Sequence, residues 1–249
     1  MRVVVTNDDG IDSPGLLALA GTAREHGWDV VVAAPARESS GTSAGLTAAE
    51  HGRSVAVERR ELAGLPGVPA FAVAAHPGLI ALVACQGAFG DPPEVVLSGV
   101  NRGANIGRAV LHSGTVGAAL TASINGARAM AVSLDVGLGD PDEVVEYHWG
   151  TATAVARGVF ERLVALPPGV VLNLNVPNRE RVGPPLRAGL AEFGAVQTRL
   201  KQVGDGGIDV APLVVEGELP PGSDAALLAQ GHPTITPLRS VAEDLEVEL

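Results

Sequence analysis

The chain has 249 residues, a formal net charge of −11 and an apolar content of 46%, while aromatic residues account for only 3%. This length and composition suit one large α/β domain with an aliphatic core and a small appendage, and they exclude a disordered chain. The acidic balance and the single lysine, Lys201, argue against a protein that binds the phosphate backbone of duplex nucleic acid.

Cysteine and histidine usage limits the metal chemistry that the chain can support. Cys85 is the only cysteine, which excludes an intrachain disulfide and a thiolate metal cluster. Any bound metal must therefore have oxygen or imidazole ligands, which favours hard cations such as Mg²⁺ or Mn²⁺. The histidines show no metal-ligand spacing, and His112 is the one candidate proton donor.

The N-terminus shows no targeting segment. The first apolar run is interrupted after Thr6 by an Asn-Asp-Asp turn, and no later apolar stretch approaches the ~20 residues that span a bilayer. We therefore expect a cytoplasmic protein that does not enter a membrane.

The opening run, Met1 to Thr6, is rich in β-branched residues and predicts a strand buried on both faces of a parallel sheet. Asp8 and Asp9 follow at its carboxyl end, the edge where open α/β sheets bind ligands. An Asp-Gly turn is a common structural device, but a second carboxylate adds repulsion without improving the turn. The pair therefore favours a functional role.

The next segment completes a β-α-β unit. A helix begins at Pro14 and stops at Gly27, and Trp28–Ala34 forms the second strand. Right-handed connection makes the two strands parallel neighbours, so the loop at Ser39 opens on the same edge as the acidic turn. A serine hydroxyl there could complete a hard-metal site, although hydroxyl-rich loops are often only solvated turns.

The middle of the chain has a glycine-dense loop at 98–107. It follows a short strand, Glu94–Leu97, and carries Asn101 and Asn105 four residues apart. Glycines allow close backbone approach to an anion, and asparagine offers a carbonyl oxygen to a metal and an N–H donor to a phosphate. The alternative interpretation is a flexible linker.

A helix from Ser113 to about Ala127 follows. Its start, Ser113-Gly114-Thr115, presents free N–H groups and the positive end of the helix dipole, which favour phosphate; simple N-capping by Ser113 is the alternative. No P-loop or dinucleotide-binding fingerprint occurs, which disfavours a nucleoside triphosphatase or a nicotinamide enzyme.

The remaining elements follow from periodicity and turn residues. Between Arg179 and Pro221 no periodicity is sustained, and we interpret this stretch as an extended hairpin or arm that packs on another subunit. The other expected elements are short strands within 50–71, a helix over Leu79–Phe89, a strand over Ala129–Leu134, a helix capped at Asp140 and reaching Leu166, a strand over Val170–Val176, a helix over Asp224–Gln230 and a strand over Thr234–Leu238.

Taken in order, several motifs resemble the SurE family across nearly the whole chain. They are Val-Thr-Asn-Asp-Asp-Gly-Ile-Asp-Ser-Pro-Gly at 5–15, Ala-Pro-Ala-Arg-Glu-Ser-Ser-Gly-Thr at 34–42, Ser-Gly-Val-Asn-Arg-Gly-Ala-Asn-Ile-Gly at 98–107, Ser-Gly-Thr-Val-Gly-Ala-Ala at 113–119, Leu-Asn-Leu-Asn-Val-Pro at 172–177 and Ile-Thr-Pro-Leu at 235–238. The resemblance implies one SurE-like domain over 1–249: a Rossmann-like three-layer α/β core with a mostly parallel sheet at 1–177, and an arm with subunit-swapping elements at 178–249.

The resemblance also implies an activity, that of a metal-dependent phosphatase and 5′-nucleotidase acting on nucleoside 5′- and 3′-monophosphates, in a homodimer or homotetramer. It implies one divalent ion per subunit, Mg²⁺ or Mn²⁺. The implied metal ligands are Asp8, Asp9, Ser39 and Asn101; the implied phosphate-binding residues are Asn105, Ser113, Gly114 and Thr115; and the implied catalytic residues are Asp8, Asp9, Asn105 and Ser113.

The sequence departs from the family pattern at four places. Arg108 stands where the family usually has an acidic residue, His112 and His232 stand where it has aromatics, and Thr121-Ala122 replaces Glu-Gly. The four implied metal ligands are intact, so these departures bear on substrate preference, turnover and subunit contact.

Three interpretations fit these residues, two of them catalytic. The first is metal-assisted hydrolysis of a phosphomonoester, with Asp9 orienting the attacking water. The second forms an aspartyl phosphate on Asp8 or Asp9, which adjacent carboxylates suit less well than carboxylates spaced two apart. The third is a nucleotide-binding or regulatory protein with weak or no turnover, in which Arg108 neutralises a phosphate without catalysis.

Overall fold

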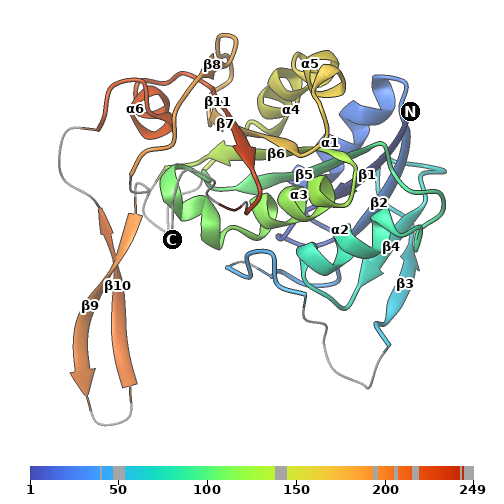
Figure 1. Ribbon diagram of the computed structural model, residues 1–249, viewed down its shortest axis with the longest axis horizontal. Helices are drawn as coiled ribbons and strands as arrows, with labels where there is room; N and C mark the ends of the chain where they lie inside the picture. Colours follow the sequence, from blue (N-terminus) through green and yellow to red (C-terminus); the bar gives the residue numbers. More distant parts are fainter. Residues whose placement is uncertain are drawn as a thin grey trace.

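The structure is a computed structural model that describes residues 1–39, 41–46, 54–137, 145–192, 196–204, 207–214, 219–241 and 243. Its main feature is a nine-stranded sheet in the order β3-β4-β2-β1-β5-β6-β7-β11-β8 (Figure 1). These strands are β1 (Arg2–Thr6), β2 (Asp29–Pro35), β3 (Val57–Arg60), β4 (Ala70–Val73), β5 (Val95–Arg102), β6 (Arg128–Asp135), β7 (Val170–Pro177), β8 (Leu186–Arg187) and β11 (Thr234–Arg239).

The sheet is mostly parallel, as predicted. Strands β4, β2, β1, β5, β6 and β7 are parallel neighbours, whereas β3 pairs antiparallel with β4 and β11 pairs antiparallel with β7. The parallel strands therefore place their carboxyl ends at one edge, which the acidic turn after β1 shares with the segments that follow β2 and β5.

Helices cover both faces of the sheet (Figure 1). Val3 and Val5 of β1 belong to a core cluster that includes Leu16 of the first helix and Phe160, whereas Val4 belongs to the opposite cluster. This alternation along a central strand is what a sheet buried on both faces requires. The helices are α1 (Pro14–Glu25), α4 (Trp149–Arg157) and α5 (Phe160–Ala165) on the first face, α2 (Pro77–Cys85) and α3 (Gly114–Ile124) on the second, with the short 3₁₀ helix η1 (Gly107–His112) before α3 and α6 (Asp224–Ala229) near the C-terminus.

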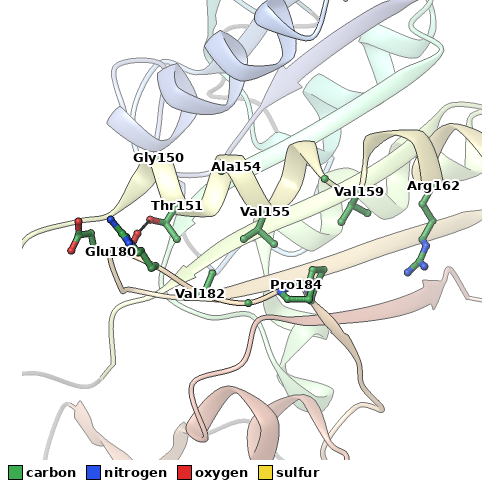
Figure 2. A pocket seen from close by; sticks show the side chains of 13 residues that line it. Gly150, Thr151, Ala154, Val155, Val159, Arg162, Glu180, Val182 and Pro184 are labelled. Carbon is green, nitrogen blue, oxygen red and sulfur yellow. Dashed lines mark hydrogen bonds between the residues drawn. The ribbon is translucent and has the colours of Figure 1, made fainter.

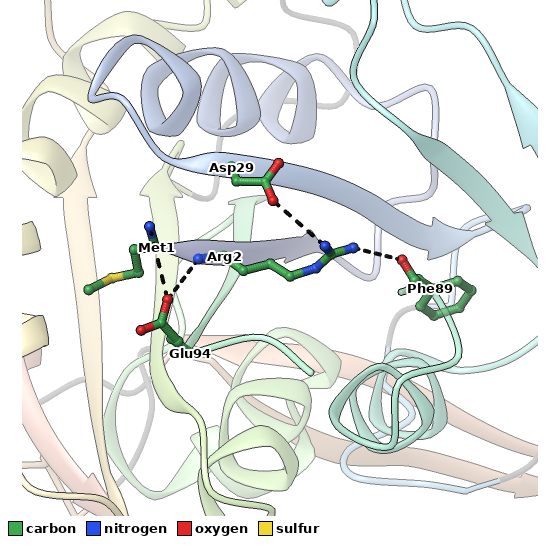
Figure 3. Close-up of polar contacts among 5 residues, drawn as sticks. All are labelled: Met1, Arg2, Asp29, Phe89 and Glu94. Atoms are coloured by element: carbon green, nitrogen blue, oxygen red, sulfur yellow. Dashed lines mark hydrogen bonds and ion pairs between the residues drawn. The ribbon is translucent and has the colours of Figure 1, made fainter. Parts of the chain in front are cut away.

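Charged side chains tie the amino ends of the strands together. The backbone N–H of Arg2 donates to Glu94 Oε2 at 2.9 Å, and the Arg2 guanidinium lies 3.6 Å from Asp29 Oδ2 and donates to the Phe89 carbonyl (Figure 3). Arg2 thus links β1 to the starts of β2 and β5 at the edge opposite the acidic turn. The carboxylates at this edge have a cation beside them.

Strand β5 is longer than predicted. The sequence pattern predicts that the strand ends at Leu97, but β5 continues to Arg102, with a register shift against β6 between Ser98 and Asn101. A Cβ on Gly99 would lie 2.2 Å from the Val132 carbonyl oxygen, so only glycine allows this approach of β5 to β6. Gly99, one of the glycines that favour a loop in the sequence, therefore serves close strand packing here.

Two helix predictions were wrong in extent. Helix α2 spans Pro77–Cys85, beginning and ending earlier than predicted, because Pro77 takes the first helical turn after an extended His76. The segment ending near Leu166 contains α4 and α5, interrupted at Gly158, in place of one long helix. The predicted cap at Asp140 lies outside the described residues.

The C-terminal third adds two features to the sheet. Strands β9 (Val196–Gly204) and β10 (Gly207–Val214) pair antiparallel as a separate two-stranded sheet that extends away from the core (Figure 1). This is where the sequence predicts a hairpin, and its contact with another subunit stays a prediction. Strand β11 returns to the main sheet beside β7. Among the described residues, no helix is long and apolar enough to cross a membrane.

Candidate metal and phosphate site

The acidic turn after β1 does not depend on its carboxylates. Asn7 Nδ2 donates to the Gly10 carbonyl at 3.0 Å, and the Gly10 N–H donates to Asn7 Oδ1 at 3.2 Å. Asn7 therefore closes the turn, with Gly10 at a φ of +100°. The backbone conformation of the turn therefore does not require the side chains of Asp8 and Asp9.

Asp8 is joined to the start of α3. Its side chain is 4% exposed, Oδ1 accepts from the Thr115 hydroxyl, and Oδ2 accepts from the Thr115 N–H at 3.1 Å. A Cβ on Gly114 would lie 2.8 Å from Asp8 Oδ2, so glycine is required for the helix to approach this closely. The Asp8 carbonyl also accepts from the Ser39 N–H at 2.7 Å, which ties the loop after β2 to the turn.

Burial makes ionisation of both carboxylates unfavourable. It raises the pKa of Asp8, an effect that the Thr115 hydrogen bonds oppose. Burial and the nearby charge of Asp8 raise the pKa of Asp9 to about 6, against a hydrogen bond from the Arg102 N–H to Asp9 Oδ2 at 3.2 Å. Two crowded carboxylates of this kind are stabilised by a cation.

Two residues that carry neutral oxygens are linked to the pair through backbone contacts. Ser39 is partly buried in the loop after β2, and Asn101 follows in β5 next to Arg102, whose N–H contacts Asp9. Asn101 Nδ2 donates to the Gly103 carbonyl at 2.7 Å. The N–H end of the amide is therefore hydrogen-bonded within the protein, and Oδ1 is the end that offers an oxygen to a cation.

This donor set fits a hard divalent ion. Among the described residues there is no group of three or more His, Cys, Asp or Glu side chains that could hold a metal. An ion at this edge would therefore be held by the two carboxylates together with the oxygens of Ser39 and Asn101, which are the ligand types that Mg²⁺ and Mn²⁺ prefer.

His76 is a neighbour of the site that the sequence did not reveal. Its Nδ1 lies 3.1 Å from Ser39 Oγ, although the two residues are distant in the chain. His76 follows β4, which lies parallel to β2, so their carboxyl ends share the edge. The strand order places His76 at this edge, whereas the spacing of the histidines along the sequence gives no sign of it.

The turn before α3 has the geometry of a helix N-cap. Ser113 Oγ accepts from the Val116 N–H at 3.1 Å, and the first residues of the helix are buried. Both donors of Thr115 go to Asp8, so Thr115 links the helix start to the carboxylates. The helix terminus still presents its positive dipole end at this edge, as an anion site requires. His112 is exposed and does not enter this network.

Asn105 lies farther along the edge, over β6 and β7. Its Nδ2 donates to Ser133 Oγ at 2.9 Å, and its backbone N–H donates to Asn175 Oδ1 at 2.7 Å. The Asn105 amide is thus held against Ser133, and its contact with a phosphate oxygen stays a prediction.

Other features lie away from this site. A cavity of about 830 Å³ between α4, α5 and residues 180–185 contains none of the predicted site residues (Figure 2). Cys85 is partly buried, and burial raises the pKa of its thiol to about 11, which makes it a poor nucleophile.

The chain matches one protein family over most of its length. Residues 3–192 match the family model described as Survival protein SurE. The chain belongs to the SurE family. Its similarity to named members of the family covers different shares of the sequence.

Two relatives and one solved structure illustrate the range. The "5'-nucleotidase SurE" of Caulobacter vibrioides strain NA1000 is 41% identical over 180 residues, covering 71% of this chain and 64% of the relative. The protein of the same name from Gloeobacter violaceus is 35% identical over 249 residues, covering 96% of this chain and 90% of the relative. The crystal structure of the SurE protein from Aquifex aeolicus superposes with a TM-score of 0.75 at 24% identity, over 96% of this chain and 93% of that one.

The SurE relatives differ in how much of their own length the chain matches. The match spans 64% of the length of the Caulobacter relative and of that from Xanthomonas oryzae strain PXO99A, against 90% of the Gloeobacter relative. The Aquifex structure supports the α/β fold, with its mostly parallel sheet.

Proposed function

We propose that the protein is a divalent-metal-dependent phosphomonoesterase that hydrolyses nucleoside 5′- and 3′-monophosphates to nucleoside and phosphate. The observation that carries the proposal is the Asp8–Asp9 pair, in which Asp8 is buried and hydrogen-bonded to the helix start at Thr115. This places a cation-binding group and an anion-binding group next to each other. Relatives named 5'-nucleotidase SurE support the substrate class.

The residues have separate roles in this reaction. Asp8, Asp9, Ser39 and Asn101 would hold one Mg²⁺ or Mn²⁺ ion, which supplies a Lewis acid for the phosphoryl group and lowers the pKa of water. Ser113 and Gly114 at the start of α3, with Asn105, would bind and orient the phosphoryl oxygens, while Thr115, whose two donors go to Asp8, would position that carboxylate.

Asp9 would orient the attacking water and hold its proton. The water oxygen forms a bond to phosphorus, the bond from phosphorus to the nucleoside oxygen breaks, and that oxygen takes up a proton.

The aspartyl-phosphate alternative is less consistent with the spacing of the carboxylates. Asp8 and Asp9 are adjacent in the chain, which suits shared metal ligation better than the pair of carboxylates spaced two apart that this chemistry uses. Trapping a covalent phosphoenzyme in a quenched reaction would decide for this alternative.

A binding protein without turnover is the second candidate function. Arg108 lies exposed on η1, five positions before Ser113, where it can neutralise a phosphate. This function predicts nucleotide affinity without phosphate release.

Assembly and location belong to the same proposal. The hairpin formed by β9 and β10 extends from the core and provides the element for a homodimer or homotetramer contact (Figure 1). A cytoplasmic nucleotide pool would supply the substrate.

A metal-dependence assay tests the proposed function. Purified protein is incubated with Mn²⁺, Mg²⁺ or a chelator, with nucleoside 5′- and 3′-monophosphates and an aryl phosphate as substrates. We expect phosphate release that requires the metal and is lost with chelator. Measurable nucleotide binding without metal-dependent phosphate release would favour the binding protein.

A further inference from the structure

Two buried asparagines in a central strand have no role in the site as described above. Asn173 and Asn175 alternate along β7 with the core residues Leu172, Leu174 and Val176, and both are 0% exposed. A buried amide is costly unless its polar atoms are hydrogen-bonded, and a valine would pack at either position without that cost. Packing in the core therefore does not explain the two asparagines.

Both amides bind the backbone of a single residue, Asn105. Asn173 Nδ2 donates to the Asn105 carbonyl at 2.8 Å, and Asn175 Nδ2 donates to the same oxygen at 2.9 Å. Asn175 Oδ1 accepts from the Asn105 N–H at 2.7 Å. The backbone polar groups of Asn105 are thus satisfied by two side chains from the sheet below it.

The strand register explains how these contacts converge. Ser133 of β6 pairs with Asn175 of β7, and Asn101 of β5 pairs with Ser133. Asn105 therefore sits over a row that begins at an implied metal ligand, and its own Nδ2 donates to Ser133 Oγ at 2.9 Å. Backbone and side chain of Asn105 are held independently.

Asn173 shows that this arrangement serves Asn105 rather than the core. Among the described residues, Asn173 Oδ1 is buried without a hydrogen-bond partner, so the amide has only its donor satisfied. Leaving a buried acceptor unpaired is unfavourable. The hydrogen bond from Asn173 Nδ2 to the Asn105 carbonyl offsets part of that cost.

We propose that Asn173 and Asn175 are positioning residues that, with Ser133, fix Asn105 and thereby aim its amide at the phosphoryl group. This inference rests on the proposed function for the role of Asn105. The predicted consequence is that these residues control phosphate binding and turnover through Asn105 and not through the metal ligands.

The test compares Asn175→Asp and Ser133→Ala with a matched control. Asp at 175 keeps the shape and an acceptor for the Asn105 N–H but removes the donor to its carbonyl, whereas Ser133→Ala frees the Asn105 amide. The control is Asn178→Ala, because Asn178 clamps a remote loop in the same way: its Oδ1 accepts from the His148 N–H at 2.9 Å and its Nδ2 donates to the Glu146 carbonyl at 2.8 Å.

Five quantities are measured for each variant: kcat and KM with a nucleoside monophosphate, Kd for inorganic phosphate in the presence of Mn²⁺, Kd for Mn²⁺ alone, and Tm. We expect Asn175→Asp and Ser133→Ala to lower kcat/KM about 10- to 100-fold and to weaken phosphate binding, with Mn²⁺ affinity within about twofold of wild type. Asn178→Ala should lower Tm and leave kcat/KM unchanged.

A purely structural role gives a different result. Wild-type kcat/KM and phosphate affinity in Asn175→Asp and Ser133→Ala, with a lower Tm only, would overturn the inference. The two failures are distinguishable, because a wild-type protein that releases no phosphate contradicts the proposed function, whereas an active wild type matched by both variants contradicts only the positioning role. If Asn175→Asp does not fold, the kinetics and phosphate affinity of Ser133→Ala decide between the two roles.

Discussion

At the residue scale, the acidic turn holds two carboxylates in a position that is unfavourable for their charge. Asn7 closes the turn through its own amide, so Asp8 and Asp9 are not needed for the backbone conformation. Both are carried into a poorly solvated position where ionisation is unfavourable. Such strain is typical of sites that are completed by a ligand.

Asp9→Asn should therefore stabilise the metal-free protein at neutral pH while abolishing metal-dependent hydrolysis. The pKa of Asp9 is raised from 3.8 to about 6, so its ionised form costs stability above pH 6. Asparagine removes the charge and keeps an acceptor for the Arg102 N–H. We expect Tm at pH 7.5 to rise by about 2–4 °C.

The pH dependence has a definite sign. Because the folded-state pKa is raised, the penalty is complete above about pH 6, shrinks as pH falls, and is gone below about pH 4. The Tm difference between Asp9→Asn and wild type should shrink over the same range in thermal melts with chelator present. A variant less stable than wild type at pH 7.5 would show that the carboxylate is not strained.

At the element scale, the site depends on how closely α3 approaches the end of β1. Gly114 allows this approach, because a side chain at position 114 would collide with Asp8. The sequence predicted a helix beginning at this point, but not that Thr115 would turn both of its donors to a carboxylate more than a hundred residues earlier. Such contacts follow from tertiary packing, which local periodicity does not encode.

Gly114→Ala should displace the helix start from Asp8. The added Cβ would lie 2.8 Å from Asp8 Oδ2, so α3 or the acidic turn must shift. We expect at least a tenfold loss of kcat/KM, since misplacement by about 1 Å is enough for such an effect. The matched control is Gly150→Ala in α4, where a Cβ meets nothing within 4 Å and activity should be retained. Equal activity in both variants would contradict the proposed role of the helix start.

The same scale shows what the sequence could and could not predict. The first β-α-β unit was predicted closely, because Pro14 and Gly27 mark its helix and valines mark its strands. The extent of β5 was missed because Gly99 serves strand contact rather than a loop. His76 was missed because its contact with Ser39 depends on the parallel pairing of β2 and β4.

At the scale of the whole molecule, the C-terminal third is connected to the candidate site. Asp224, at the start of α6, is fully buried and accepts hydrogen bonds from the N–H groups of Gly107, Ala191 and Ala225 at 2.8–2.9 Å. It thereby joins α6 and the segment near Ala191 to the beginning of η1. The sequence showed Asp224 only as the start of a helix.

Asp224→Ala should destabilise the whole protein. Three buried N–H groups would lose their acceptor, and each loss costs about 1–3 kcal/mol. We therefore expect the free energy of unfolding to fall by several kcal/mol in total. Denaturant unfolding checks this. Asp224→Asn keeps one acceptor oxygen and should fall between wild type and Asp224→Ala; an unchanged midpoint in both would show that these bonds contribute little.

The hairpin tests the assembly. Replacing residues 196–214 with a short Gly-Ser linker should leave the far-UV circular dichroism of the core intact and reduce the oligomer measured by light scattering. The main sheet does not include β9 or β10, so the core has no need of them. An unchanged mass per assembly, after correction for the deletion, would contradict the subunit-contact role.

The central claim is that Asp8 and its neighbours hold a divalent ion that drives phosphate release. The most direct measurement is phosphate release from a nucleoside 5′-monophosphate during a Mn²⁺ titration of wild type and Asp8→Asn, with circular dichroism confirming that both are folded. The account predicts saturable, Mn²⁺-dependent release by wild type and a loss of at least a hundredfold in Asp8→Asn, the order expected when a metal site is broken. Full Mn²⁺-dependent activity in folded Asp8→Asn would contradict it.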